Sequence, residues 1–102
     1  MIAIRFEWDE AKNRSTRRKH GVGFEEASQV FFDPFCISVR DRIEGGEQRW
    51  RTIGMVEGLL LVMVAHTVRE EHDDGTSIEV IRIISARHAT RKEKRRYEEE
   101  NG

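Results

Sequence analysis

The sequence contains one cysteine and one proline in 102 residues, and it has no long hydrophobic run. Cys36 alone cannot form an intramolecular disulfide, and it leaves no four-cysteine or Cys/His zinc pattern. The longest apolar run, residues 59–65, is far shorter than the roughly 20 residues that cross a membrane. The first residues also lack the apolar stretch of a secretory signal. We therefore expect a small cytoplasmic globular domain over residues 1–102, with no membrane partner.

Charge is abundant but segregated along the chain. The 18 Lys and Arg residues oppose 19 Asp and Glu residues, and a net charge of -1 argues against a uniformly basic nucleic-acid binder. Residues 12–20 nevertheless carry five cations and no acid, and residues 82–96 carry seven cations against Glu93 alone. If both runs fold onto one side, they form a basic surface suited to phosphate. Each run can equally be a solvated helix face.

The N-terminal third predicts a strand and two helices. Alternating apolar residues over 2–8 indicate a short strand. A helix over 10–20 follows, with Asp9 as its N-cap and Gly21 in the left-handed conformation that ends it. Aromatic residues at helical spacing predict a second, shorter helix over 24–32.

The hydrophobic period then changes to two, which predicts strands over 35–40, 49–56, 59–65 and 78–86 and a polar loop over 70–76. Thr90 and Glu93 have capping-box spacing and predict a last helix that ends near Glu100. Short connections favour an antiparallel meander. We therefore expect an α+β fold with two N-terminal helices, a twisted antiparallel sheet of about four strands and a C-terminal helix, with the helices on one face of the sheet.

No motif points to a metal, a nucleotide or a covalent nucleophile. The four histidines lack the H-x-x-x-H and H-E-x-x-H spacings of metal sites. Neither the G-x-x-x-x-G-K-[ST] phosphate loop nor the G-x-S-x-G nucleophile turn is present. Cys36 falls in a strand pattern, where a cysteine is more often a small core residue. We therefore expect no cofactor.

The remaining candidates are arginines in and beside the predicted strands. Arg49 and Arg51 share one face of their strand, and Arg82 interrupts the apolar face of the last strand. A charge in such a place pairs with an acid such as Glu47 or points into a cleft. Together these arginines can form an anion-binding floor, because guanidinium groups bind phosphate in bidentate fashion. Each of them alone can equally be a surface ion pair.

Basic residues at the element ends extend this set. Lys19 and His20 close the first helix, where the helix dipole favours a cation. We expect the last strand to stop just before Arg87, so that Arg87 turns toward the same cleft as this helix end. Lys92 and Arg96 are expected on the exposed side of the last helix.

Three segments resemble the BrnT family of type II toxins. FEWDEAKNRSTRRKHGVGFEEA, residues 6–27, is similar to the family's W-D-x-x-K…K-H-G-x-x-F pattern. GEQRWRTIG, residues 46–54, resembles its G-E-x-R-x-x-x-I-G strand, and residues 81–99 resemble its closing I-I-S-x-R-x-A-x-x-x-E-R segment. The family pattern has asparagine at the position of Thr16, lysine at His88, and arginine at Lys94 after Glu93.

The resemblance implies a RelE-like fold and a ribonuclease that inhibits translation and growth. It also implies a small antitoxin like BrnA, which has a ribbon-helix-helix domain. The toxin–antitoxin pair would contact operator DNA only through this domain. The implied substrate is RNA, either free RNA or ribosome-bound mRNA. Since no metal motif is present, we expect metal-independent cleavage.

The residues and the resemblance together define a candidate site. His20 is the first candidate for the general acid or general base, and the other cations would stabilise the charge on the phosphate. Tyr97 would transfer a proton or stack on a nucleobase; alternatively, its ring packs on the sheet. The predicted catalytic residues are Lys19, His20, Arg51, Arg82, Arg87 and Tyr97. The predicted RNA-binding residues are Lys12, Arg14, Arg49, Arg69, Arg91 and Arg95. Two alternatives remain: a non-catalytic nucleic-acid-binding module, or an interaction protein that docks through the acidic residues 70–79.

Overall fold

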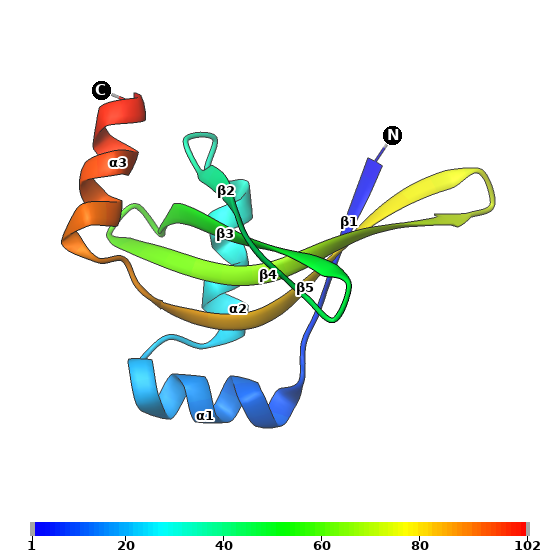
Figure 1. Ribbon diagram of the computed structural model, residues 1–102, viewed down its shortest axis with the longest axis horizontal. Coiled ribbons are helices and arrows are strands. Elements are labelled where there is room, and N and C mark those ends of the chain that lie inside the picture. Colours follow the sequence, from blue (N-terminus) through cyan, green and yellow to red (C-terminus); the bar gives the residue numbers. More distant parts are fainter. Residues whose placement is uncertain (1, 102) are drawn as a thin grey trace.

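The computed structural model describes residues 2–101 and shows a five-stranded sheet with helices on both faces (Figure 1). The strands are β1 (Ile2–Glu7), β2 (Ile37–Glu44), β3 (Glu47–Val56), β4 (Leu60–Asp73) and β5 (Thr76–His88). The helices are α1 (Glu10–His20), α2 (Phe24–Ala27) with the 3-10 helix η1 (Ser28–Phe32), and α3 (Arg91–Asn101). The α+β class is confirmed. No helix in this part of the chain has the length and apolar composition needed to span a membrane.

The first helix has the boundaries that its end signals predict. The Asp9 carboxylate accepts hydrogen bonds from the amides of Ala11 (2.9 Å) and Lys12 (3.3 Å), which caps the first turn of α1. Gly21 ends the helix at φ 75°, and its amide donates to the carbonyl of Arg17. The predicted helix over 24–32 is correct in position only, because one α-helical turn continues as a 3-10 helix.

The sheet differs from the prediction in strand number and direction. Its order is β1-β5-β4-β3-β2, and β1 joins β5 in parallel while the other pairs are antiparallel. The prediction of about four antiparallel strands was therefore wrong by one parallel strand. Alternation identifies a strand but not its partner, and the partner of β1 lies about 75 residues away along the chain.

Each face of the sheet has its own core. The buried residues on the α1 side are Val22, Phe24, Ala27, Val30, Val56, Val62, Val64, Ile81, Ile83 and Ala86. A smaller cluster of Ile53, Leu61, Met63 and Ala89, with Tyr97 of α3 packed against it, lies on the other side. The expectation that all helices cover one face was thus wrong, because α3 covers the opposite face from α1 and α2.

The predicted polar loop over 70–76 is instead the end of a long hairpin. Strands β4 and β5 continue to a tight turn at Asp74 and Gly75, whose positive φ values of 47° and 76° are typical of a two-residue hairpin loop. Ion pairs hold this hairpin beside β1: Arg5 lies 2.8 Å from Glu71, and Arg69 lies 2.6 Å from Glu7. Polar residues therefore form strands here because cross-strand charge pairs replace apolar packing.

A β-bulge in β5 decides which side chains share a face. Ala65 pairs with Ser85 and His66 pairs with Ile83, so Ile84 has no partner in β4. The extra residue reverses the alternation beyond it, and Arg82 and Arg87 consequently point to the same face despite their odd spacing. The strand also runs on to His88, so the expectation that it stops before Arg87 was wrong.

Candidate active site

Cationic side chains from two strands, β3 and β5, meet on the face that α3 covers. Residues paired in register share a face of the sheet. Arg51 on β3 pairs with Ala65 on β4, and Ala65 pairs with Ser85 on β5. Arg87 follows Ser85 by two residues and points the same way. The Arg51 and Arg87 side chains therefore lie on the same face of the sheet.

A pocket of about 320 Å³ between this face and α3 collects the charges. Its lining residues are Val39, Arg51, Ile53, Arg87, Thr90, Lys92, Glu93 and Arg96, and we call it the cationic cleft. Four of these residues are basic and one is acidic. Lys92 and Arg96 are exposed on α3, as expected, and both also line the cleft.

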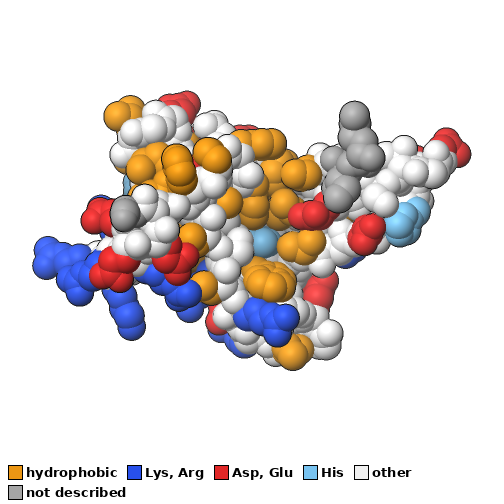
Figure 2. All heavy atoms as spheres, turned by 90° about the horizontal axis from the view of Figure 1, so that it is seen from above, with side chains coloured by type: hydrophobic (Ala, Val, Ile, Leu, Met, Phe, Trp, Pro, Cys, Tyr) orange, Lys and Arg blue, Asp and Glu red, His pale blue; other side chains and the backbone are white. Residues whose placement is uncertain are grey.

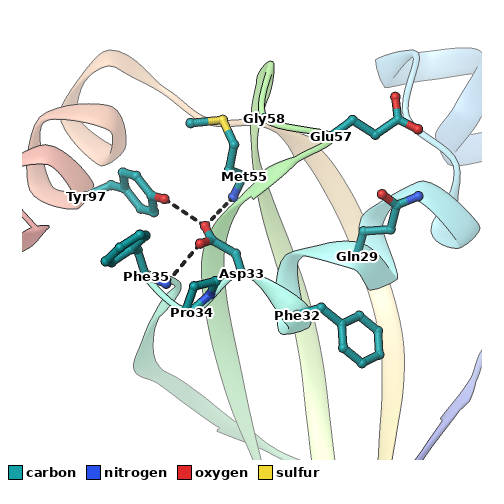
Figure 3. A pocket seen from close by; sticks show the side chains of 9 residues that line it. All are labelled: Gln29, Phe32, Asp33, Pro34, Phe35, Met55, Glu57, Gly58 and Tyr97. Atoms are coloured by element: carbon teal, nitrogen blue, oxygen red, sulfur yellow. Dashed lines mark hydrogen bonds between the residues drawn. The ribbon is translucent and has the colours of Figure 1, made fainter.

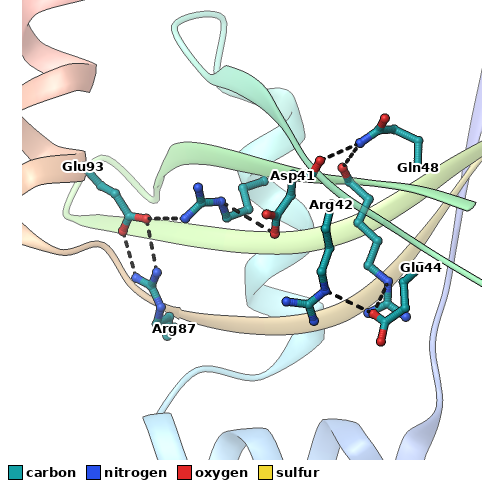
Figure 4. Close-up of polar contacts among 8 residues, drawn as sticks. Asp41, Arg42, Glu44, Gln48, Arg87 and Glu93 are labelled. Carbon is teal, nitrogen blue, oxygen red and sulfur yellow. Dashed lines mark hydrogen bonds and ion pairs between the residues drawn. The ribbon is translucent and has the colours of Figure 1, made fainter.

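Glu93 is the acid of the cationic cleft, and its side chain is only 14% exposed. Its Oε1 accepts hydrogen bonds from Arg87 Nη1 (2.8 Å) and the Thr90 amide (2.9 Å), and its Oε2 accepts one from Arg87 Nη2 (3.1 Å). Figure 4 shows the two bonds from Arg87. The Glu93 amide donates to Thr90 Oγ1 (3.2 Å), which confirms the capping box. Burial alone would raise the pKa of Glu93, but the bonds from Arg87 and Thr90 outweigh it and lower that pKa.

Two buried donors near the cleft are not used. The Nε atoms of Arg49 and Arg51 are buried and make no hydrogen bond within the described chain. The nearest carboxylates, Glu44 for Arg49 and Asp41 for Arg51, lie 3.2 and 3.8 Å away without hydrogen-bond geometry. Buried polar groups normally have partners, so these guanidinium groups retain capacity for an anion. In residues 2–101, no group of three His, Cys, Asp or Glu side chains is placed to hold a metal.

A smaller basic pocket of about 200 Å³ is lined by residues of β3, β4 and β5 and by the start of α1. Lys12 of α1, Arg49 and Arg82 line it, together with Glu47. Arg82 pairs with Glu7 at 3.5 Å rather than with Glu47. Three of the predicted residues are therefore brought together here.

The end of α1 lies across the sheet from the cationic cleft. Val22 and Phe24, which follow α1 directly, are buried in the core on the α1 side, and Figure 1 shows α1 beneath the sheet. Arg87 therefore does not approach Lys19 and His20, contrary to our expectation. Arg14 is likewise exposed on α1.

The other predicted RNA-binding residues also lie outside the cationic cleft. Arg91 and Arg95 are exposed on α3. Arg69 is bound by the carboxylates of Glu7 and Glu71, whose hydrogen bonds raise the pKa of the Arg69 guanidinium. Arg69 thus stabilises the hairpin where it lies.

Tyr97 lines a second, largely apolar pocket of about 630 Å³ (Figure 3). Its hydroxyl donates to Asp33 at 2.7 Å, and Asp33 also accepts from the amides of Met55 and Phe35. Burial and the Asp33 carboxylate raise the pKa of Tyr97 to about 12. Tyr97 therefore joins α3 to the sheet, which agrees with the alternative prediction that its ring packs there. Phe32 and Phe35 at the same pocket are 66% and 56% exposed.

Sequence reasoning missed a chain of polar contacts on the α1 side, in which Thr52 and His66 are buried. Ser38 Oγ lies 2.7 Å from Thr52 Oγ1, which lies 2.7 Å from His66 Nε2. The ring of Phe31 packs edge-on against His66 with centroids 4.8 Å apart. Burial lowers the pKa of His66 to about 4. The sequence signal for a buried His66 was weak, because this residue only follows the apolar run of the central strand.

Asn13 was also missed. It is 2% exposed, its Oδ1 accepts the Phe24 amide (2.8 Å), and its Nδ2 donates to Glu10 (3.1 Å) and Glu25 (2.9 Å). This side chain therefore joins α1 to the start of α2. Thr16, at the position where the resemblance has asparagine, is buried one turn later.

Comparison with known protein families identifies the family of this chain. The model of the family described as "Ribonuclease toxin, BrnT, of type II toxin-antitoxin system" matches residues 8–93. The chain belongs to the BrnT family. A solved structure with the same fold is the 1.1 Å crystal structure of the Brucella abortus ribonuclease toxin BrnT, at 23% identity and TM-score 0.53. The alignment covers 89% of this chain and 99% of that one. Comparison with individually curated proteins gives no match.

The segment shared with the BrnT family includes most of the cationic cleft. It contains all of β2 to β5, and with them Arg51 and Arg87, and it extends to Glu93. Arg96 and Tyr97 lie just beyond the matched residues.

Proposed function

We propose that this BrnT-family protein is an endoribonuclease whose active site is the cationic cleft. The observation that carries the proposal is the pair of guanidinium groups, Arg51 and Arg87, that line one cleft on the same face of the sheet. Guanidinium groups placed in this way can bind the oxygens of a phosphodiester in bidentate fashion. Lys92 and Arg96 extend the positive charge along α3.

The proposed reaction is attack of a ribose 2′-hydroxyl on the neighbouring phosphorus. A 2′,3′-cyclic phosphate forms, and the 5′-oxygen leaves with a proton. Negative charge builds on the phosphorane oxygens, where Arg51 and Arg87 would stabilise it without a metal ion. We therefore propose metal-independent cleavage, free or ribosome-bound mRNA as the substrate, and arrest of translation and growth as the consequence. The RelE-like character of the fold stays a prediction.

The partner in this proposal is a small antitoxin like BrnA, whose ribbon-helix-helix domain would contact operator DNA for both chains. Exposed aromatic residues are a feature of protein-binding surfaces, and Phe32 and Phe35 border the 630 Å³ pocket. Figure 2 shows hydrophobic side chains gathered on one face, with Lys and Arg projecting at the end where α3 lies. Glu57 at this pocket favours an antitoxin segment whose apolar side chains are flanked by Lys or Arg.

The test combines purified protein with expression in bacteria. We expect the wild type to cleave an RNA oligonucleotide in EDTA and to leave cyclic or 3′-phosphate ends. Arg87→Ala should lower the rate on the order of 100-fold. Because it is purified identically, this variant also controls for contaminating nucleases. Binding without cleavage would instead favour a nucleic-acid-binding module, and neither binding nor cleavage would favour an interaction protein.

The growth arms of the test separate activity from neutralisation. Expression of the wild type alone should arrest growth, and co-expression of the antitoxin should restore it. Phe35→Asp should remain toxic but lose the rescue, because the substitution lies at the apolar pocket rather than in the cationic cleft. If the antitoxin rescues growth with Phe35→Asp as well as with the wild type, it binds at another surface.

A further inference from the structure

The cationic cleft holds one group that can take a proton from a hydroxyl at neutral pH. Among its lining residues, Val39 and Ile53 are apolar, the arginines and Lys92 are cations, and Thr90 is an alcohol. Glu93 is the remaining residue, and within residues 2–101 it is the only carboxylate that lines the cleft. Asp41 on β2 contacts Arg51 from outside, at 3.8 Å.

The two oxygens of Glu93 are not equivalent. Oε1 accepts two hydrogen bonds, from Arg87 and from the Thr90 amide. Oε2 accepts one, from Arg87, and lies 3.9 Å from Arg51 Nη1. A carboxylate oxygen can accept about two hydrogen bonds. Oε2 therefore keeps a free acceptor position between the two guanidinium groups that would hold the phosphate.

We propose that Glu93 is the general base of the cleavage reaction. This inference rests on the proposed ribonuclease function. The 2′-hydroxyl attacks the phosphorus that is bonded to the 3′-oxygen of the same ribose, so a phosphate held by Arg51 and Arg87 brings the hydroxyl to the neighbouring carboxylate. Arg87 positions Glu93, and Arg51 and Arg87 stabilise the charge that develops.

The step balances as a transesterification. Glu93 Oε2 takes the 2′-hydroxyl proton while the 2′-oxygen forms its bond to phosphorus. The bond from phosphorus to the 5′-oxygen breaks, and that oxygen takes a proton from water in the cleft. Glu93 then returns its proton to solvent, which leaves a 2′,3′-cyclic phosphate and a free 5′-hydroxyl end.

This assignment replaces His20 as the base. His20 lies at the end of α1 on the opposite side of the sheet, away from the paired arginines. The capping-box spacing predicted a structural role for Glu93 as the third residue of α3, and its hydrogen bonds with Thr90 confirm that role as well.

Glu93→Gln separates the chemistry from the structure. Glutamine also serves in a capping box, so it can accept the Thr90 amide and a bond from Arg87, but it cannot take a proton. We expect cleavage to fall at least 100-fold, the usual range for a lost general base, while binding of a 2′-deoxy oligonucleotide stays unchanged or becomes tighter. Glu93→Asp should keep measurable cleavage above the glutamine variant. Glu99→Gln, the same charge change at an exposed position of α3, should cleave like the wild type.

Three results would overturn the inference. If folded Glu93→Gln cleaves within threefold of the wild type, another group is the base. If cleavage and 2′-deoxy oligonucleotide binding fall together, Glu93 acts only by holding Arg87. If Glu93→Gln does not fold, Glu93→Asp decides. A Glu93→Asp variant that folds, binds RNA normally and cleaves at the wild-type rate would show that the position of the carboxylate does not matter, and Glu93 would not be the base. A wild type that does not cleave RNA would be a failure of the proposed function itself.

Discussion

At the scale of single residues, His66 shows how burial sets the charge of a side chain. It is 3% exposed, and its ring lies between Thr52 Oγ1 and the ring of Phe31. Neither neighbour carries a charge that could stabilise an imidazolium. The folded protein therefore holds His66 neutral, and burial lowers its pKa from 6.5 to about 4.

The stability of the protein should therefore depend on pH through His66. Because its folded pKa is lowered, its stabilising contribution is present above pH 6.5 and is lost as the pH falls toward 4. Between pH 7.5 and 5, we expect the wild type to lose roughly 2 kcal/mol of unfolding free energy that His66→Gln does not lose. Urea unfolding at each pH measures this difference. His72→Gln, at an exposed position, is the control, and parallel curves for wild type and His66→Gln would refute the prediction.

The same scale marks the limit of what the sequence could predict about the site. Arg51 and Arg87 were predicted as site residues, and they meet in one cleft. Lys19 and His20 were predicted with them, because the sequence places basic residues along the chain but not on a face of the sheet. One unpaired residue, Ile84, decides the face of Arg87, and the sequence carries no signal of that bulge.

At the scale of elements, α3 is held by a few polar contacts rather than by burial. None of its described residues is fully buried. Glu93 binds Arg87, Tyr97 binds Asp33, and Asn101 donates to the carbonyl of Phe35. The helix that completes the cationic cleft therefore depends on individual side chains for its position.

Removing the Tyr97 hydroxyl should loosen α3. Tyr97→Phe keeps the ring against the sheet but leaves Asp33 with its two amide donors, so we expect a loss of about 1 kcal/mol in unfolding free energy at pH 7. The folded pKa of Tyr97 is raised from 10 to about 12, so the wild-type advantage should be full below pH 10 and shrink as the pH rises toward 12. Denaturant unfolding of both proteins at pH 7 to 11 measures it. A gap that stays constant up to pH 11 would contradict this account.

Elements defined by local signals were predicted well, and elements defined by distant contacts were not. The boundaries of α1 follow from Asp9 and Gly21, which act on their own neighbours. The parallel pairing of β1 with β5 and the polar end of the β4–β5 hairpin depend on contacts such as Arg69 with Glu7, across 62 positions. The hydrophobic periodicity of a segment carries no information about contacts so far away along the chain.

At the scale of the whole molecule, the basic charge is divided between two sides of the sheet. The run over residues 12–20 belongs mainly to the exposed surface of α1, whereas the cationic cleft combines β3, β5 and α3. The net charge of -1 conceals this division. Only one of the two surfaces needs to contact the RNA backbone, and our assignment of the active site requires that it is the cleft.

Salt dependence of RNA binding distinguishes the two surfaces. Each phosphate contact contributes about 0.7 to the slope of log K against log salt for a single strand. Lys92→Ala combined with Arg96→Ala should therefore reduce the slope by about 1.4. Arg14→Ala combined with Lys19→Ala, which removes two cations from α1, should leave it unchanged. Fluorescence anisotropy with a labelled 2′-deoxy oligonucleotide measures both, because that strand cannot be cleaved.

The comparison is matched, since each double variant removes two positive charges and shifts the net charge equally. A non-specific effect of net charge would lower affinity for both variants alike, whereas a contact surface lowers the slope for one. Circular dichroism melting should show both variants folded, because all four side chains are exposed. If the slope falls for the α1 variant and stays constant for the α3 variant, RNA lies along α1, and Lys19 and His20 regain the catalytic role that the sequence suggested.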